Sequence, residues 1–360
     1  MTTAPVPDTL PEALSPQWLT SALHPRYPGL QVRKVDPGPI VDRVSTNARF
    51  TIECTGGVPE NLSPDLCVKG YFNEQGRETR AAGEPEACFY RDLADATGVR
   101  TLRSVYADFD EHTRHGVVIT EDVVAAGGSF LDAGSSFTPD QVAQSLEQFA
   151  QLHAATWGNP AWAGQTWLTP RLTGALRAFG VDEITARIHR NLHGPNGRRV
   201  PAELRDAPRL VAAYQGLVNA LAAEHEASDW CVIHGDAHVG NLYLDGRGFP
   251  GLVDWQLVQR GMWYLDVGTH IATALDPDDR RSTERDLLVH YLDCLSSRGV
   301  EPPPPDAAWR ALGRGIVRGL YLWGITVKVE PRLIEILLHR LSTAAADHDA
   351  LSPELFSAPC

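Results

Sequence analysis

Alternating apolar and polar positions run through the first third of the chain. Five segments rich in β-branched and aromatic residues, bounded by turn residues, are predicted as strands: 31–38, 47–54, 66–72, 101–110 and 116–124. Residues 84–98 show helical spacing, an acidic first turn and a closing glycine, so we expect a helix there. This order of strands around one helix is typical of an α+β unit with an antiparallel sheet.

The pattern changes after the glycine-rich segment 125–136. Helical periodicity predominates in 138–158, in most of 170–228 and in the chain after 256. A strand, a loop and a second strand interrupt the helices at 230–256. We therefore predict an N-lobe over residues 1–124 and a mostly helical C-lobe over residues 125–360.

Composition narrows the classes of partner. The chain has 360 residues, 43% of them apolar, which is ordinary for a globular protein of two domains or lobes. Its formal net charge of −13 argues against nucleic-acid binding, which depends on Lys and Arg neutralising phosphates. The six cysteines form no CxxC pair, and we find neither a signal peptide nor a membrane-spanning run. We expect a cytoplasmic protein that binds neither nucleic acid nor membrane.

The segment "VIHGDAHVGN", residues 232–241, carries the most informative chemistry. Asp236 and Asn241 lie in a loop between two strands, and Asp254 ends the apolar strand that follows. The spacing H-x-D-x-x-x-x-N, followed by a strand-terminal Asp, is that of a kinase catalytic loop and its metal-binding Asp. The pattern predicts that Asp236 orients a substrate hydroxyl, while Asn241 and Asp254 present hard oxygens to Mg²⁺.

Residues for holding a nucleotide are expected upstream. Lys69 lies on the strand 66–72, where a kinase places its phosphate-binding lysine, and Glu86 of the next helix is placed to pair with it. The turn between the first two strands lacks glycines, but its amides and hydroxyls can cradle an anion. The candidate phosphate contacts are Ser45, Thr46 and Asn47. The candidate hinge, whose backbone would hydrogen-bond the base, is Glu121, Asp122 and Val123.

With these residues, the chain resembles the aminoglycoside phosphotransferase-like kinases, and within them the ecdysteroid-kinase-like and choline-kinase-like group. The residues that carry the resemblance are "HGDAHVGN", "VDWQ", "EACFYRDL", "FAQLHAATWG" and "QRGMWYLDVG". The resemblance spans roughly residues 10–330. It implies an α+β, protein-kinase-like bilobal fold and a protein that uses ATP and Mg²⁺. It also implies that Asp236 is the catalytic base, that His234 braces the loop, and that Asp266 caps a helix and holds the loop backbone.

Several alternatives remain open at the level of sequence. His234, Asp236 and His238 could form a zinc site, although no further ligand is evident. A pseudokinase that binds nucleotide without turnover is a second alternative. The sequence does not decide whether the protein prefers ATP or GTP, what its oligomeric state is, or what role His238 has.

The resemblance implies that the acceptor is a hydroxyl group of a small molecule. The aromatic and apolar segments 261–268 and 319–327 favour a lipophilic or neutral alcohol. An aminoglycoside, a hydroxyacyl-CoA and a choline-like cation held by tryptophans are alternatives.

Overall fold

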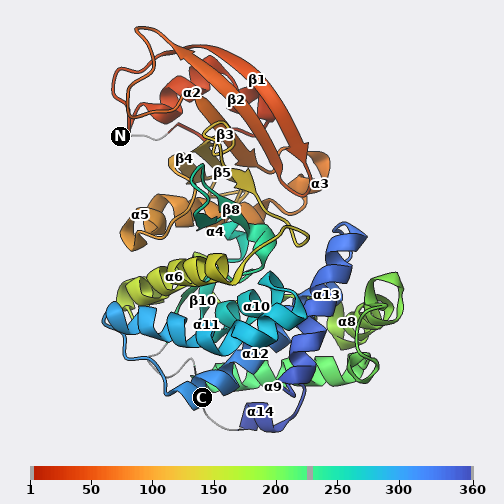
Figure 1. Cartoon of the computed structure of the whole chain (residues 1–360). Coiled ribbons are helices and arrows are strands. Elements are labelled where there is room, and N and C mark those ends of the chain that lie inside the picture. The colour runs from red at the N-terminus through yellow and green to blue at the C-terminus, as the bar shows by residue number, and fades with distance from the viewer. Residues whose placement is uncertain (1–3, 225–229, 358–360) are drawn as a thin grey trace. The chain divides into compact units, whose positions relative to one another are not determined.

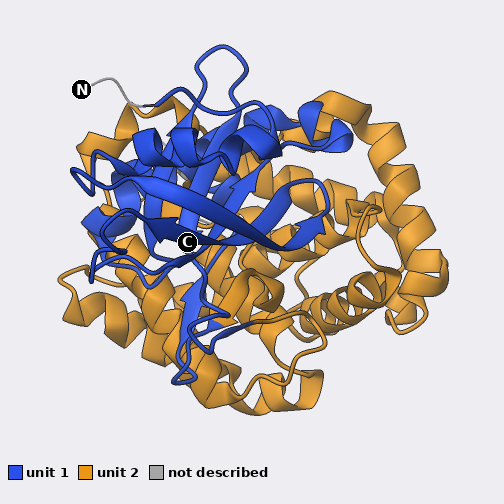
Figure 2. Ribbon diagram, turned by 90° about the horizontal axis from the view of Figure 1, so that it is seen from above, with its two compact units in different colours: residues 1–129, 244–258 blue, residues 130–243, 259–360 orange. Residues whose placement is uncertain are grey.

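A computed structural model describes residues 4–224 and 230–357. The chain forms two compact units. Unit 1 is Met1–Ser129 with Leu244–Val258, and unit 2 is Phe130–Tyr243 with Gln259–Cys360 (Figure 2).

Unit 1 is built on a five-stranded antiparallel sheet, in which β1 and β2 run as long neighbouring strands (Figure 1). The strands are β1 (Val32–Asp42), β2 (Thr46–Cys54), β3 (Asp65–Gly70), β4 (Ser104–Phe109) and β5 (Gly116–Glu121). Their spatial order is β1-β2-β3-β5-β4, so the hairpin β1-β2 continues into β3 and the hairpin β4-β5 closes the other side.

The two faces of this sheet differ in chemistry because successive side chains point to opposite faces. One face, including Ala48, Phe50 and Leu66, is buried in a core shared with helix α2 (Pro16–Leu23). The other face carries polar side chains. Its register places Asn47 opposite Lys69 and Arg49 opposite Cys67.

Short helices and a returning segment complete unit 1. The helices are α1 (Leu10–Ala13), α3 (Glu74–Arg77), η1 (Arg80–Ala82), α4 (Gly83–Cys88), the π-helix η2 (Phe89–Leu93) and α5 (Ala94–Thr97). The helix predicted at 84–98 is therefore a helical path with a π-turn at its centre. The returning segment contains β9 (Pro250–Leu252) and η7 (Trp255–Leu257).

Residues 244–258 belong to unit 1 although they follow a long stretch of unit 2, so the units differ from the continuous division into residues 1–124 and 125–360 expected from the sequence. Leu252 pairs with Thr101, and the Trp255 ring stacks on Phe89 with centroids 3.6 Å apart. Trp255 is fully buried by these contacts. Long-range packing, rather than any local pattern, assigns residues 244–258 to unit 1.

Unit 2 is mostly helical. Its helices are α6 (Pro139–Thr156), α7 (Pro160–Ala163), η3 (Thr166–Leu168), α8 (Gly174–His193), η4 (Pro195–Gly197), η5 (Ala202–Leu204), α9 (Ala207–Glu224), η6 (Val239–Asn241), α10 (Tyr264–Ala274), α11 (Pro277–Ser297), α12 (Pro305–Ile325), α13 (Pro331–Asp347) and α14 (Glu354–Ser357). Strands β7 (Cys231–Ile233) and β10 (Gln259–Gly261) pair antiparallel. The chain passes from one unit to the other within strand β6 (Ser129–Phe130) and again within strand β8 (Leu242–Leu244). No helix among the described residues is long and apolar enough to cross a bilayer.

Helix α10 is buried along its whole length, which fits a helix at the centre of a bundle. It lies against α12 so closely that a Cβ atom on Gly315 would stand 1.9 Å from the Tyr264 carbonyl oxygen. This approach requires glycine. Helices α10 and α12 supply Asp266 and Arg318, which hold the loop described next.

Candidate active site

The loop between β7 and β8 holds Asp236 and Asn241 together. The Asn241 side-chain Nδ2 donates to the backbone oxygen of Asp236 at 2.9 Å and to its Oδ2 at 3.1 Å. Because Nδ2 is used in this way, the side-chain oxygen of Asn241 is left for another ligand.

Buried side chains brace the backbone of this loop from several directions. Asp266 is fully buried and accepts the amides of His234 at 2.6 Å and Gly235 at 2.9 Å. Arg318 donates to the Gly235 carbonyl oxygen at 2.9 Å. The loop is thus held through its main chain, and its conformation is set before any ligand binds.

A second layer of buried groups orients Asp266. His153 lies 3.3 Å from Oδ2 of Asp266 through its Nε2, and its Nδ1 lies 2.7 Å from the Tyr291 hydroxyl. Burial alone would raise the pKa of Asp266, but the hydrogen bond from His153 and the loop amides outweigh it and lower that pKa. Asp266 therefore stays ionised at neutral pH as a charged acceptor for the loop.

His270 contributes to the same bracing. Burial lowers its pKa to about 4, so its ring is neutral at pH 7. The Ala237 carbonyl can only accept, so Nδ1 of His270 carries the proton and donates across the 3.1 Å contact.

Asp236 has the properties of a carboxylate that accepts a hydrogen bond from a hydroxyl. Burial tends to raise its pKa, but His238, His234 and the Asn241 amide outweigh this and lower that pKa. Its side chain keeps 20% exposure. An ionised and partly accessible carboxylate can orient an incoming hydroxyl and take its proton.

His238 lies beside Asp236. Its Nδ1 accepts the Gly240 amide at 3.0 Å, its Nε2 lies 3.7 Å from Oδ2 of Asp236, and its ring meets Trp323 edge-on. Within the described ranges, no three His, Cys, Asp or Glu side chains are grouped as a metal site requires, so the zinc alternative has no support here.

Unit 1 carries a second cluster of charged groups, centred on Lys69. Its Nζ lies 2.7 Å from Oε2 of Glu86 and 2.9 Å from Oδ1 of Asp254. The three side chains differ in exposure: Glu86 is 5% exposed, Lys69 18% and Asp254 32%. The lysine is held from the buried side by Glu86, and Asp254 is the accessible member.

The electrostatics keep Lys69 charged. Burial by itself lowers its pKa, but the carboxylates of Asp254 and Glu86 outweigh burial and raise the pKa well above its ordinary value. The other glutamate of α4, Glu84, pairs instead with Arg114. The two glutamates of this helix thus have different cationic partners.

Asp254 has an unusual backbone conformation. Its φ of 67° and ψ of 64° lie in the left-handed region, which Asp enters more readily than most residues. The next residue anchors it, because the Trp255 amide donates to Oε1 of Glu86 at 3.3 Å and its indole donates to the Thr101 hydroxyl at 3.0 Å. Strained backbone of this kind persists where neighbouring contacts over-determine it.

Of the turn residues expected to contact phosphates, Thr46 and Asn47 point to opposite faces of the unit 1 sheet. Thr46 is buried and its hydroxyl donates to Asp42 at 2.7 Å, so its side chain supports the turn from the core side. Asn47 lies opposite Lys69 and shares its face. Ser45 accepts the Arg43 amide with its carbonyl oxygen.

The three hinge candidates also differ. The Glu121 carboxylate accepts the Ser63 amide and Arg103, and the Glu121 backbone amide donates to the Arg103 carbonyl oxygen at 2.9 Å. Asp122 accepts the Val124 amide at 2.9 Å. The Val123 carbonyl oxygen accepts the Gly128 amide.

Sequence reasoning missed the roles of Arg318, His270 and Tyr291. A signal for Arg318 was present, because an arginine within the apolar helix α12 needs a buried acceptor. The aromatic segments used to favour a lipophilic acceptor are largely packing residues, since Trp263, Tyr264 and Tyr321 are buried. The acceptor class therefore stays a prediction.

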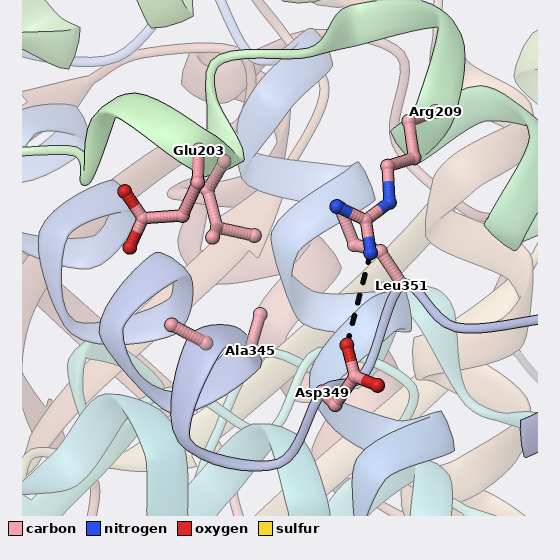
Figure 3. Close-up of a pocket in the computed structure, with 7 residues that line it drawn as sticks. Glu203, Arg209, Ala345, Asp349 and Leu351 are labelled. Atoms are coloured by element: carbon pink, nitrogen blue, oxygen red, sulfur yellow. Dashed lines mark ion pairs between the residues drawn. The ribbon is translucent and has the colours of Figure 1, made fainter.

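A small cavity of about 140 Å³ lies elsewhere on unit 2, between η5, the start of α9 and the end of α13 (Figure 3). Arg209 and Asp349 form an ion pair at its rim, with 3.7 Å between their charged atoms. None of its lining residues belongs to the Asp236 loop.

Asn241 has a side-chain oxygen that takes no part in its hydrogen bonds to Asp236, and Asp254 has a second oxygen besides the one that Lys69 contacts. Amide and carboxylate oxygens are hard ligands of the kind that Mg²⁺ prefers.

Comparison with known proteins identifies the family. The profile of the phosphotransferase enzyme family matches residues 72–311, two thirds of the 360-residue chain. A search of curated proteins found no match.

Several solved kinases are similar to this chain. A choline kinase from Cryptosporidium parvum Iowa II is 13% identical, with a TM-score of 0.54 and coverage of 88% of this chain and 91% of that one. An ethanolamine kinase from Plasmodium vivax is 10% identical, with a TM-score of 0.49 and coverage of 86% and 82%. An aminoglycoside phosphotransferase from Alicyclobacillus acidocaldarius is 17% identical, with a TM-score of 0.48 and coverage of 90% and 92%.

The expected fold is confirmed. It is an α+β, protein-kinase-like fold with an antiparallel-sheet lobe and a mostly helical lobe. The expected resemblance is confirmed as well: the chain belongs to the phosphotransferase enzyme family.

Proposed function

We propose that this phosphotransferase transfers the γ-phosphate of a nucleoside triphosphate, ATP in the prediction from sequence, to a hydroxyl group of a small molecule. The observation that carries the proposal is the Asp236–Asn241 pair, an ionised carboxylate and an oriented amide on a braced loop. Neither residue would need this arrangement as an ordinary loop residue.

The proposed roles follow from the contacts of each residue. Asp236 accepts the hydrogen bond of the acceptor hydroxyl and takes its proton as the phosphoryl group transfers. Lys69, positioned by Glu86, binds phosphate oxygens, and Asn47 on the same face adds a polar contact. The backbone of Glu121, Asp122 and Val123 receives the base, and Ser45 and Thr46 support the turn over the phosphates.

Asn241 and Asp254 are proposed to hold Mg²⁺ through their side-chain oxygens. The bound ion would supply positive charge to offset the negative charge that develops on the phosphate oxygens. Lys69 contacts one oxygen of Asp254 and so orients the carboxylate for this role.

The acceptor is proposed to be an alcohol, lipophilic or neutral, that reaches Asp236 beside His238 and Trp323. The test is a screen of the purified protein with Mg²⁺ and either ATP or GTP against sterols and other neutral alcohols, aminoglycosides, choline and hydroxyacyl-CoAs, with nucleoside diphosphate release as readout. Acceptor-dependent release by one class supports the proposal and names the class. If the protein binds nucleotide but releases no diphosphate, either with any of these acceptors or without one, it is a pseudokinase.

A further inference from the structure

A cavity lined by both polar and apolar residues lies on the same sheet face of unit 1 as Lys69. Its volume is about 240 Å³, and Arg49, Thr51, Asp65 and Asp122 are among the residues that line it.

The distance of the cavity from Lys69 suits a nucleotide. Residues Asp65, Cys67 and Lys69 alternate onto one face of β3, and the rise is roughly 3.4 Å per residue. Asp65 is therefore roughly 14 Å from Lys69 along the strand, and the Arg49–Cys67 pair roughly 7 Å. If Lys69 holds the phosphates, as proposed above, the base of the same nucleotide reaches this cavity.

Arg49 is held by one edge of its guanidinium. Its Nε lies 3.5 Å from Oδ2 of Asp122, whose other oxygen accepts the Val124 amide. Its side chain is 32% exposed, and no residue among those described accepts a hydrogen bond from its two terminal nitrogens. These two donors can take a pair of adjacent acceptors on a ligand.

Guanine and adenine differ in what they present to such a group. Guanine has two neighbouring acceptors, O6 and N7, which Arg binds in bidentate fashion, whereas adenine places an amino donor beside N7. The N1–H and N2 amino donors of guanine also suit the carboxylates of Asp65 and Asp122, while N1 of adenine is an acceptor. We propose that this cavity takes guanine and that Arg49 selects it over adenine, an inference that rests on the proposed function.

The test compares GTP with ATP for the wild type and for Arg49→Ala. A bidentate Arg–guanine pair discriminates by roughly tenfold or more, so we expect kcat/KM for GTP to exceed that for ATP by at least about tenfold. In Arg49→Ala the two values come within about threefold of each other, and Arg49→Lys does not restore the difference, because lysine lacks the planar fork. The matched control is Arg33→Ala, an exposed arginine of β1 paired with Glu53, which leaves the ratio unchanged.

Equilibrium binding separates this inference from the proposed function. Calorimetry with the Mg²⁺ complexes of GDP, ADP and tripolyphosphate gives three outcomes. Tighter binding of GDP than ADP, lost in Arg49→Ala while tripolyphosphate binding persists, supports the inference. Equal or tighter binding of ADP by the wild type overturns the inference alone. Absence of binding by all three ligands overturns the proposed function and this inference with it.

Discussion

The buried carboxylate of Asp266 is expected to hold the Asp236 loop in its active shape, and the variant Asp266→Asn tests this. The carboxylate accepts two loop amides, from His234 and Gly235, at full burial. An asparagine of the same size can accept one of them, and its amide nitrogen then faces the other.

The expected loss follows from these two bonds. Charge-assisted hydrogen bonds contribute about 1.5–3 kcal/mol each, and the remaining neutral bond about 1 kcal/mol. The free energy of unfolding therefore falls by about 2–5 kcal/mol, a large share of the 5–15 kcal/mol typical of a domain. The turnover rate falls as well, because the loop amides no longer fix the position of Asp236.

Urea unfolding followed by tryptophan fluorescence measures the change, alongside turnover with the best acceptor. The matched control is Asp286→Asn, the same replacement at an exposed position in α11, where we expect a change within about 0.5 kcal/mol. If Asp266→Asn and Asp286→Asn lose the same stability, the buried carboxylate does not hold the loop.

Three further predictions test the surrounding contacts. Glu86→Gln weakens the hold on Lys69 and lowers kcat/KM at least about tenfold, whereas Glu84→Gln on the same helix changes it less than about threefold. Folding lowers the pKa of Asp266 from about 3.8, so the stability that this carboxylate contributes is present above pH 3.8 and is lost as the pH falls through the native pKa. The free energy of unfolding of Asp266→Asn should therefore decrease less steeply with acid than that of the wild type. Trp255→Ala removes the fully buried ring stacked on Phe89 and lowers the free energy of unfolding by about 3–5 kcal/mol.

Each of these has a contradicting result. Equal kinetic losses in the two glutamate variants would show that Glu86 has no special relation to Lys69. An acid unfolding curve of the same slope in Asp266→Asn and wild type would mean that another group dominates the pH dependence. A Trp255→Ala protein as stable as the wild type would show that residues 244–258 do not depend on this anchor.

The sequence predicts the elements well where local pattern decides them. The five strands of unit 1 lie within or next to the segments where the alternation predicts them. The capping box at Thr138 likewise marks the start of α6. Local propensity and packing agree at these positions.

Features that depend on contacts between residues far apart in the sequence cannot be predicted from local patterns. The π-turn at Phe89–Leu93 lies where Phe89 stacks on Trp255, more than 150 residues away. The left-handed conformation of Asp254 depends on the anchoring of its neighbour, and the network of Asp266 with His153 and Tyr291 joins three helices. No window of adjacent residues contains these partners.

The most direct test of the proposed transfer reaction is the variant Asp236→Asn, which keeps the shape of the side chain and removes its basicity. Transfer to the acceptor found in the screen is measured in a single turnover, and nucleotide affinity is measured by calorimetry on the same protein. We predict a fall in the transfer rate of about 10²–10⁴-fold with nucleotide affinity within about threefold of the wild type. A variant that transfers phosphate at the wild-type rate would contradict the assignment of Asp236 as the base.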